Sequence, residues 1–425
     1  MTKQLKRLAS FLAVLALLCS LAVAVGAAED PADLSLCLLA DPANPGLQFK
    51  ADGTFTIIQV ADMQEFAISS KITRDFLYDL AKTERPDLFV LSGDNIHCAE
   101  ADPLPGVLAR MLIKAGIDGF MDVFDKIYDE FGTRVTMVYG NHDNEATKVV
   151  TKAQEFAMYA AHRSFVGHYV EAADKGTLDE QGQHYGTHNL LVNGSGSAGA
   201  TPVFGIWMFD SGSYDLRGGY SCVQKPQIDW FKATNEATGK LPSLAFQHIP
   251  VAETVNYLAP ADPSDPTAWR REYYDAQGEL VTKYVSPILP AGVKGEIYGA
   301  PGSGSYSQGQ CAALDEAGNV LALFWGHDHN NTYELRRADG TDLVNSPASG
   351  FGNYGEARIR GARVITLQES DLTDYDTHIV RYLDFYGDGP LWKARVELFS
   401  TINSAANIFD VLFFRPLLWI SGLFA

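Results

Sequence analysis

The feature that most constrains this chain is a short apolar run that ends abruptly in polar residues, a pattern that occurs at five places. One such run, Val135–Tyr139, is long enough and β-branched enough for a buried strand. It stops at Gly140, which permits a sharp turn, and Asn141, His142 and Asp143 follow. The other four runs and their polar residues are Phe55–Val60 with Asp62 and Gln64, Leu88–Leu91 with Asp94, Asn95 and His97, Leu244–Phe246 with His248, and Val320–Trp325 with His327 and His329.

Helical patterns separate these apolar runs. Apolar residues recur at helical spacing in Ile72–Thr83 and in Phe120–Phe131, so the runs on either side are expected to be parallel strands. Alternating segments at His188–Asn193 and Val203–Phe209 predict strands of a second sheet. We therefore expect an α/β fold, a two-sheet β-sandwich flanked by helices. The strands expected to close the second sheet are Thr332–Leu335, Leu343–Asn345, Ala362–Leu367 and His378–Asp384.

The polar residues after the five runs are expected to meet at one edge, because open α/β sheets build their sites at the carboxyl ends of strands. So many buried carboxylate and imidazole groups would cost too much desolvation free energy without a positive partner. Carboxylate, imidazole and amide ligands, with no cysteine at these five points, favour Zn, Mn or Fe over a thiolate-rich zinc site. The ligands outnumber what one ion uses, so two ions are expected.

The order of these residues resembles the signature of the calcineurin-like metallophosphoesterases. That signature runs Asp-x-His, Gly-Asp, Gly-Asn-His-(Asp/Glu), His and Gly-His-x-His. Four further segments, Phe209–Tyr214, Gln224–Phe231, Gly350–Gly355 and Gly361–Ile365, resemble a branch related to certain purple acid phosphatases. The resemblance extends over roughly Phe55 to Asp384 and implies the four-layer metallophosphoesterase fold. It also implies hydrolysis of phosphate esters with two divalent or mixed-valence metal ions.

Carried over residue by residue, the resemblance implies a ligand role for six of the motif residues. A bridging carboxylate would contact both metals, and the remaining ligands would divide between the two sites. Asp94 would be the bridge, Asp62 and His329 would serve the first metal, and Asn141, His248 and His327 would complete the second. Two ions held about 3.5–4 Å apart can clamp a phosphoryl oxygen and lower the pKa of a bound water.

The same resemblance implies a general acid beside the metals. Metal-activated hydroxide would attack phosphorus, and His142 would protonate the departing oxygen. Asp143 would orient the His142 ring. An imidazole with an adjacent carboxylate suits acid catalysis near neutral pH.

One position departs from the family pattern, because Gln64 stands where a histidine is expected. A neutral amide is a weaker ligand, so the first metal site would be one strong ligand short. His97, three residues after Asp94, has the spacing at which purple acid phosphatases place a metal-binding tyrosine, and we expect it to replace the missing histidine. A hydrogen-bonding histidine and an unrelated loop residue are the alternatives. Gln64, Asn95 and Asn330 are expected beside the ligands, with Asn330 in contact with substrate.

Composition divides the chain into four parts. Residues 1–28 have a basic start, an apolar centre and small residues at the end, which predicts a signal peptide and export; an uncleaved membrane anchor is the alternative. Residues 29–50 form a lead-in, 51–400 the catalytic domain, and 401–425 an apolar C-terminal segment. The net charge of −19 disfavours a nucleic-acid-binding surface.

The C-terminal segment and the cysteines leave alternatives open. Ile408–Ala425 is apolar but short and interrupted for a membrane span, so we expect contact with a membrane surface or with a partner. A helix packed on its own domain and a true span are the alternatives. The four cysteines after the signal, Cys37, Cys98, Cys222 and Cys311, could form up to two disulfides or remain buried thiols.

The sequence thus predicts an exported dimetal phosphoesterase whose partner is a phosphate-ester substrate. Monoesters are favoured because of the segments that resemble purple acid phosphatases. A phosphodiesterase of the same fold is an alternative, since fold does not fix substrate. A metal-binding pseudoenzyme and a surface binding module are two further alternatives, the first because of Gln64 and the second because of the apolar C-terminus.

Overall fold

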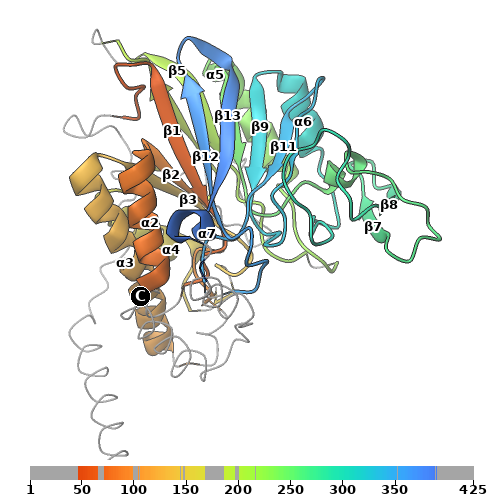
Figure 1. Cartoon of the computed structure of the whole chain (residues 1–425), viewed down its shortest axis with the longest axis horizontal. Helices are drawn as coiled ribbons and strands as arrows, with labels where there is room; N and C mark the ends of the chain where they lie inside the picture. The colour runs from red at the N-terminus through yellow and green to blue at the C-terminus, as the bar shows by residue number, and fades with distance from the viewer. Residues whose placement is uncertain are drawn as a thin grey trace, which may run out of the picture.

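Two β-sheets packed face to face form the centre of the structure, with helices on the outer face of each (Figure 1). This confirms the expected two-sheet α/β architecture. The computed structural model describes residues 46–389, except for 66–70, 99–103, 105, 144, 147–148, 168–185, 197–200, 216, 352 and 388. Residue 104 is described, although it lies alone between two of these gaps.

The first sheet combines three parallel strands with an antiparallel pair at one edge. Its three parallel strands follow one another in the chain, and helices connect them, as right-handed parallel crossovers require. The two antiparallel strands come from the end of the domain. Across the sheet the order is β13 (Asp371–Arg381), β12 (Gly361–Gln368), β1 (Thr54–Val60), β2 (Leu88–Ser92) and β3 (Arg134–Val138).

The second sheet has a parallel centre of four strands and an antiparallel strand at each edge. Its central strands carry the apolar runs that precede His248 and His327. Across the sheet the order is β10 (Glu334–Leu335), β11 (Asp342–Asn345), β9 (Val320–Trp325), β6 (Ser243–Phe246), β5 (Pro202–Met208) and β4 (His188–Asn193).

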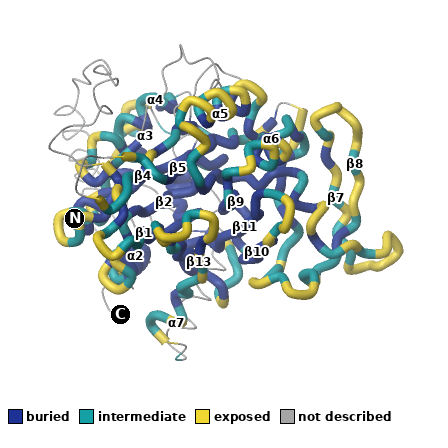
Figure 2. The backbone as a smooth tube through the Cα atoms, turned by 90° about the horizontal axis from the view of Figure 1, so that it is seen from above, coloured by how far each residue is buried: buried dark blue, intermediate teal, exposed yellow. Residues whose placement is uncertain are grey.

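The central strands are mostly apolar because both of their faces are buried (Figure 2). In β1, Ile57 points to the core between the sheets, whereas Ile58 points to the helices. In β9, Phe324 lies in the core between the sheets and Trp325 packs under the helices of the second sheet. This alternation follows from the two-residue repeat of a strand.

Helices close both outer faces. Helix α2 buries Phe76 and Leu80 at a spacing of four residues, so one face of the helix packs on the first sheet. Helices α3, α4 and α7 cover the same face, while α5, α6 and the 3-10 turn η3 cover the second sheet. Their bounds are α2 (Lys71–Glu84), α3 (Gly106–Phe131), α4 (Lys152–Ala160), α5 (Lys225–Ala237), η3 (Ala252–Asn256), α6 (Gln310–Ala317) and α7 (Tyr382–Tyr386).

Three sequence expectations about the fold were wrong. Strands β12 and β13 return to the first sheet instead of closing the second, because β12 pairs with β1. The predicted strand at His378–Asp384 ends at Arg381, and Tyr382–Tyr386 is helical. Helix α3 also begins at Gly106 and not near Phe120.

The long segment between β6 and β9 carries a hairpin of its own. Strands β7 (Trp269–Tyr274) and β8 (Leu280–Val285) pair only with each other in a two-stranded sheet. The hairpin projects from the end of the molecule beside the second sheet and is largely exposed (Figures 1 and 2).

A partly buried histidine joins α3 to the segment after α4. The ring of His162 contacts Asp125 through Nδ1 at 3.0 Å and Asp118 through Nε2 at 3.4 Å. Arg163 also pairs with Asp125 at 3.1 Å. Burial alone would lower the pKa of His162, but the two carboxylates outweigh it and raise the pKa. Hydrogen bonds from Ser164 and His162 outweigh burial at Asp125 and lower its pKa.

This contact predicts a pH-dependent contribution to stability. The pKa of His162 is raised in the folded state, so this histidine contributes its whole stabilising free energy below the unfolded-state pKa of about 6.5. That contribution to stability is lost as pH rises through the folded-state pKa. The carboxylates have lowered pKa values, so their contribution is lost as pH falls below about 4. The variant His162→Gln should therefore be destabilised by about 1 kcal/mol near pH 5.5 and by less near pH 8.5. Denaturant unfolding at both pH values measures this, and equal deficits would contradict it.

Most of the sequence expectations about the chain ends cannot be compared with described residues, whereas three of the four cysteines can. The predicted signal peptide and the apolar C-terminal segment lie outside the described residues. Within residues 46–389, apart from the gaps given above, no helix combines the length and apolar character needed to cross a membrane. Cys98, Cys222 and Cys311 are free thiols, and Cys37 lies outside the described part of the chain.

Candidate metal centre

The predicted site residues leave the two sheets at the carboxyl ends of their parallel strands. Asp62 follows β1, Asp94 follows β2, and His248 and His327 follow β6 and β9. The backbone there is under strain, because Asp62, Gln64, Asp94 and His327 all have positive φ, between 48° and 66°. Only two other non-glycine residues in the described part of the chain share this conformation. Such strain concentrates at sites that the surrounding fold holds in place.

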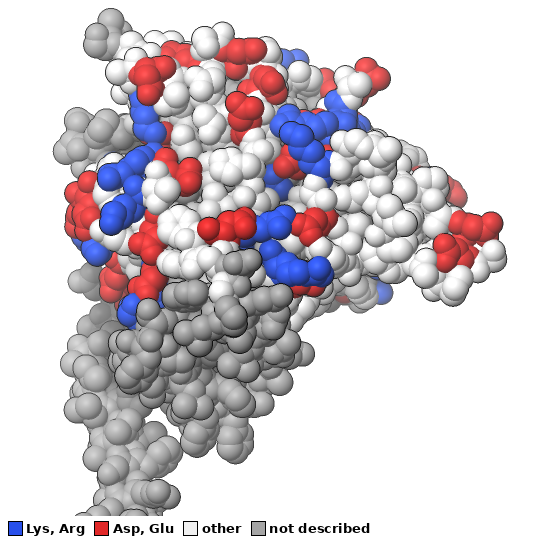
Figure 3. Space-filling view, viewed as in Figure 1, with Lys and Arg blue, Asp and Glu red and all other residues white. Residues whose placement is uncertain are grey.

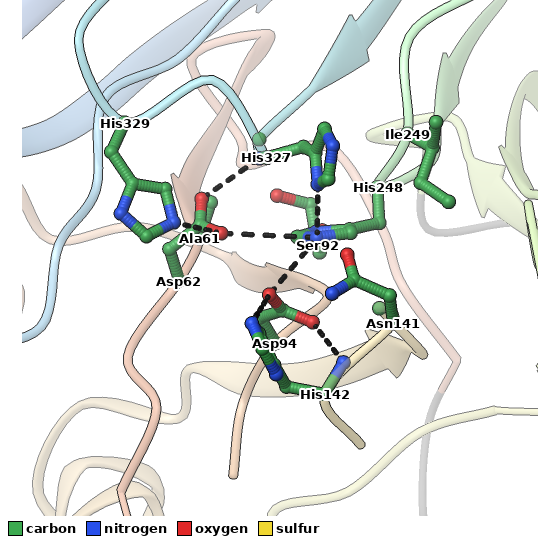
Figure 4. A network of polar contacts seen from close by, with 12 residues as sticks. Ala61, Asp62, Ser92, Asp94, Asn141, His142, His248, Ile249, His327 and His329 are labelled. Carbon is green, nitrogen blue, oxygen red and sulfur yellow. Dashed lines mark hydrogen bonds and ion pairs between the residues drawn. The ribbon is translucent and has the colours of Figure 1, made fainter. Parts of the chain in front are cut away.

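Asp94 lies at the centre of the cluster (Figure 4). Its Oδ1 accepts a hydrogen bond from the His142 backbone N–H at 2.8 Å, and its Oδ2 lies 3.3 Å from His248 Nε2. A Cβ on Gly140 would lie 2.2 Å from Asp94 Oδ1, and one on Gly93 would lie 2.6 Å from the His248 ring. Both glycines are therefore required for the close packing of these loops.

Asp62 holds the histidines of the final motif. Its Oδ1 lies 3.0 Å from His329 Nε2, and its Oδ2 accepts a hydrogen bond from the His327 backbone N–H at 2.9 Å. The rings of His327 and His248 meet through Nδ1 and Nε2 at 3.2 Å (Figure 4). Residues from both sheets thus share one polar cluster, as the strand-end pattern predicted.

Backbone carbonyl groups fix the orientation of two of the histidines. His329 Nδ1 lies 2.7 Å from the carbonyl oxygen of Tyr354, and His248 Nδ1 lies 3.0 Å from that of Ser92. Each ring is thereby turned so that Nε2 faces the carboxylates. Metal-binding histidines are usually held in this way by a hydrogen bond from their other nitrogen.

The buried charges alter the protonation of the cluster. Burial would lower the pKa of His248, but Asp94 and Asp62 outweigh it and raise the pKa to about 9. Burial and the neighbouring His248 lower the pKa of His327 to about 3. Despite burial, His248 and His142 hold the pKa of Asp94 far below its usual range. Positive charge on the protonated histidines therefore offsets the negative charge of these carboxylates.

The residues present fit a divalent metal. Asp62, Asp94 and His329 bring ligand atoms within 4.8 Å of one another, and all three are buried. The Oδ1 atom of Asn141 is buried, and no described residue donates a hydrogen bond to it. Leaving such an acceptor unpaired is costly, whereas a metal ion would satisfy it.

The His142 ring has a different carboxylate partner from the one expected. Asp143 was expected to orient the ring, but its carboxylate accepts hydrogen bonds from the backbone N–H groups of Asn95, Ile96 and Gly140, at 2.7–2.9 Å. It therefore ties the second and third motif loops together. Burial, and then the Asp94 charge, raise the pKa of Asp143 to about 7.

Glu145 takes the orienting position instead. Its Oε1 lies 2.9 Å from His142 Nδ1, while His142 Nε2 faces Asp94 Oδ2 at 3.9 Å. Burial would lower the pKa of His142, but Asp94 and Glu145 raise it to about 9. Sequence reasoning missed Glu145; its only signal was a carboxylate three residues after His142.

His97 lies with His142 and Glu145, outside the cluster of Asp62, Asp94 and His329. Its Nε2 is 3.6 Å from Glu145 Oε2, and its ring packs edge-on against that of His142 at 4.6 Å between centroids. His97, His142 and Glu145 thus form a second group of potential metal ligands, and the role of His97 as a ligand of the first metal stays a prediction.

The other polar residues near the site have supporting contacts. Gln64 Nε2 donates to Asp94 Oδ2 at 3.3 Å, and Asn95 Nδ2 donates to the Val138 carbonyl at 3.1 Å. The Asn330 carbonyl accepts a hydrogen bond from the Tyr298 N–H at 3.1 Å. Asp328 is buried and accepts a hydrogen bond from the Gly302 N–H at 2.7 Å.

Comparison with known proteins agrees with this geometry. The family model described as calcineurin-like phosphoesterase matches residues 55–331. An Arabidopsis thaliana protein named probable inactive purple acid phosphatase 28 is 28% identical over 351 residues, covering 76% of this chain and 77% of that protein. Probable inactive purple acid phosphatase 29 from the same plant is 26% identical over 386 residues, covering 78% and 82%.

A solved structure is also similar to this chain. It is that of a dimetal phosphatase from Danio rerio, which has 14% sequence identity and a TM-score of 0.40, covering 76% of this chain and 98% of that one. The family match extends over more than half of the chain and includes the five motifs through His329. This chain therefore belongs to the calcineurin-like phosphoesterase family, in a branch related to the purple acid phosphatases.

Proposed function

We propose that the chain is an exported, metal-dependent phosphoesterase that favours phosphate monoesters. The observation that carries this proposal is the buried cluster of Asp62, Asp94 and His329, with the unpaired Asn141 oxygen beside it. Asp94 would bridge two ions, the first held with Asp62 and His329. Asn141, His248 and His327 would hold the second. When bound, such ions supply Lewis-acid activation of water and of the phosphoryl oxygens.

His142 is placed to act as the general acid. Its Nε2 points toward Asp94 while its Nδ1 is held by Glu145, so a proton on Nε2 faces the side on which a substrate would bind. Burial would lower the pKa of His142, whereas the Glu145 carboxylate, which is not a proposed ligand, raises it and favours a proton on the ring. His142 would then donate it to the departing alkoxide oxygen.

Glu145 is a positioning residue in this scheme. The variant Glu145→Gln should lower kcat by about 10- to 100-fold, because the His142 ring loses its charged partner. The metal content should not change, because Glu145 is not among the residues proposed to hold the two ions. Metal analysis and steady-state kinetics on the same sample test this.

Asp143→Asn is the matched comparison for that experiment. Asp143 braces three backbone N–H groups, so its loss should lower the melting temperature, an effect that Glu145→Gln should largely lack. If Glu145→Gln kept wild-type kcat, or lost metal, Glu145 would not position His142.

Substrate preference is tested by comparing monoesters with diesters. p-Nitrophenyl phosphate should have a higher kcat/KM than bis(p-nitrophenyl) phosphate after reconstitution with Mn, Zn or Fe. The reverse order would support the phosphodiesterase alternative. Hydrolysis of neither ester would support the alternative of a metal-binding pseudoenzyme. Two observations favour that alternative: Gln64 replaces a ligand histidine, and the relatives are named probable inactive phosphatases.

Export and surface contacts are proposals supported by the sequence alone. Residues 1–28 have the pattern of a signal peptide, and Ile408–Ala425 has the apolar character of a membrane-surface or partner contact. A surface binding module, the remaining alternative, would bind its partner without Asp94 or His142. On the face drawn in Figure 3, Lys and Arg side chains alternate with Asp and Glu and form no continuous basic patch, which supports the proposal that nucleic acid is not a partner.

A further inference from the structure

Tyrosine rings extend outward from the histidines of the metal centre on two sides. The Tyr354 ring stacks on His329, with centroids 4.2 Å apart and planes inclined by 21°. The Tyr220 ring meets His327 edge-on at 4.3 Å, and Tyr214 stacks on Tyr220 at 5.7 Å and 26°. We call Tyr214, Tyr220 and Tyr354 the tyrosine rim.

The outer members of the rim are open to solvent although they touch the site. Tyr214 is 52% exposed and its hydroxyl lies 3.3 Å from Asn141 Nδ2, while Tyr354 is 47% exposed. In each case one ring face is stacked on a neighbour, so the rest of the ring is available. Burial raises the pKa of Tyr214 to about 12 and also raises that of Tyr354, so both remain neutral phenols.

Most charges close to the rim are already neutralised. Arg217, three residues after Tyr214, forms two hydrogen bonds to Asp215 at 2.6 and 2.8 Å. Arg358, four residues after Tyr354, is hydrogen-bonded to Glu356 at 2.9 Å. The Nε atom of Arg271 on β7 has no hydrogen-bond partner within the described part of the chain, and the Arg271 charge acts on Tyr220 and Asp328. One guanidinium matches a single phosphate and not a polyanionic substrate.

We propose that the tyrosine rim binds a planar aromatic group carried by the phosphate ester, so that the preferred substrates are esters whose alcohol part contains an aromatic ring or nucleobase. This inference rests on the proposed phosphoesterase function. The metals and His142 would engage the phosphate, while Tyr214 and Tyr354 offer flat apolar surfaces within reach of it. Tyrosine rings stack on bases with little dependence on their identity.

The test compares pairs of phosphate esters that both release a primary alkoxide. Within a pair, one alcohol carries a planar aromatic group and the other does not. Adenosine 5′-monophosphate and ribose 5-phosphate both release a primary ribose alkoxide, and benzyl and cyclohexylmethyl phosphate form a second matched pair. Stacking contributes about 1–3 kcal/mol per ring, so wild-type kcat/KM should favour the aromatic member of each pair by roughly 5- to 150-fold. Tyr214→Leu and Tyr354→Leu should reduce that ratio toward 1, whereas the phenylalanine variants should keep it.

Tyr257→Leu serves as the control, because Tyr257 is also exposed but packs against Arg337, away from the rim. It should leave the ratio at the wild-type value. Equal kcat/KM within both wild-type pairs would overturn the aromatic proposal and leave the phosphoesterase proposal intact. If no ester is hydrolysed by the metal-loaded protein, the proposed function fails. Calorimetric titration with adenosine 5′-monophosphate then decides: binding weakened by the leucine variants supports the rim, and no binding overturns it.

Discussion

Replacing Asp94 by asparagine is expected to remove most of the bound metal and to lower kcat/KM for a phosphate monoester by roughly 10³-fold. Asp94 is buried, contacts both His248 and the His142 backbone, and is the residue proposed to bridge the two ions. The asparagine removes the charge proposed to hold both ions, and each 1.36 kcal/mol of lost transition-state stabilisation is tenfold in rate. Metal analysis and kinetics on one purified sample measure both effects.

His97→Ala is the comparison for that variant. Because His97 lies with His142 and Glu145, we expect His97→Ala to keep the metal content of the wild type. A fall toward one ion per chain would instead make His97 the ligand that replaces the histidine missing at Gln64. Full metal content together with wild-type activity in Asp94→Asn would show that Asp94 does not bridge two ions.

Replacing His142 by asparagine should lower kcat by about 10²- to 10⁴-fold without changing the metal content, because a positioned general acid contributes that much to rate. The loss should depend on the leaving group. Alkyl phosphates release a strongly basic alkoxide that must be protonated, so they should lose most. p-Nitrophenyl phosphate releases a weakly basic phenolate and should lose far less.

This dependence separates acid catalysis from structural damage. A misfolded or metal-depleted variant would lose activity on both substrates to the same extent. An equal loss on alkyl and p-nitrophenyl phosphate would therefore contradict the assignment of His142 as the acid. Circular dichroism and metal analysis on the same sample exclude unfolding.

The parts of the fold that could be predicted are those that depend on local pattern. The runs at Phe55–Val60 and Val320–Trp325 are strands because both of their faces are buried, and residues buried on both faces read as continuous apolar stretches. Strand order was harder, because the pairing of β12 with β1 joins residues more than 300 positions apart and leaves no local signal. Helix α3 begins at Gly106, so the sequence prediction from Phe120 covered only its second half.

The site residues also divide into those that the sequence could place and those that it could not. Residues that directly follow a strand, such as Asp62 and His248, could be placed from the sequence because the strand end fixes where they lie. The partner of His142 could not, because Asp143 and Glu145 both follow it closely and only the turn decides which carboxylate reaches the ring. The placement of His97 likewise depends on how its loop turns after Asp94.

The measurement that tests the central claim most directly is the metal content and turnover of the purified chain after reconstitution with Mn, Zn and Fe. The account predicts two ions per chain and hydrolysis of a phosphate monoester that is lost in Asp94→Asn. One ion or fewer, with no hydrolysis of p-nitrophenyl phosphate or bis(p-nitrophenyl) phosphate under any of these metals, would contradict it.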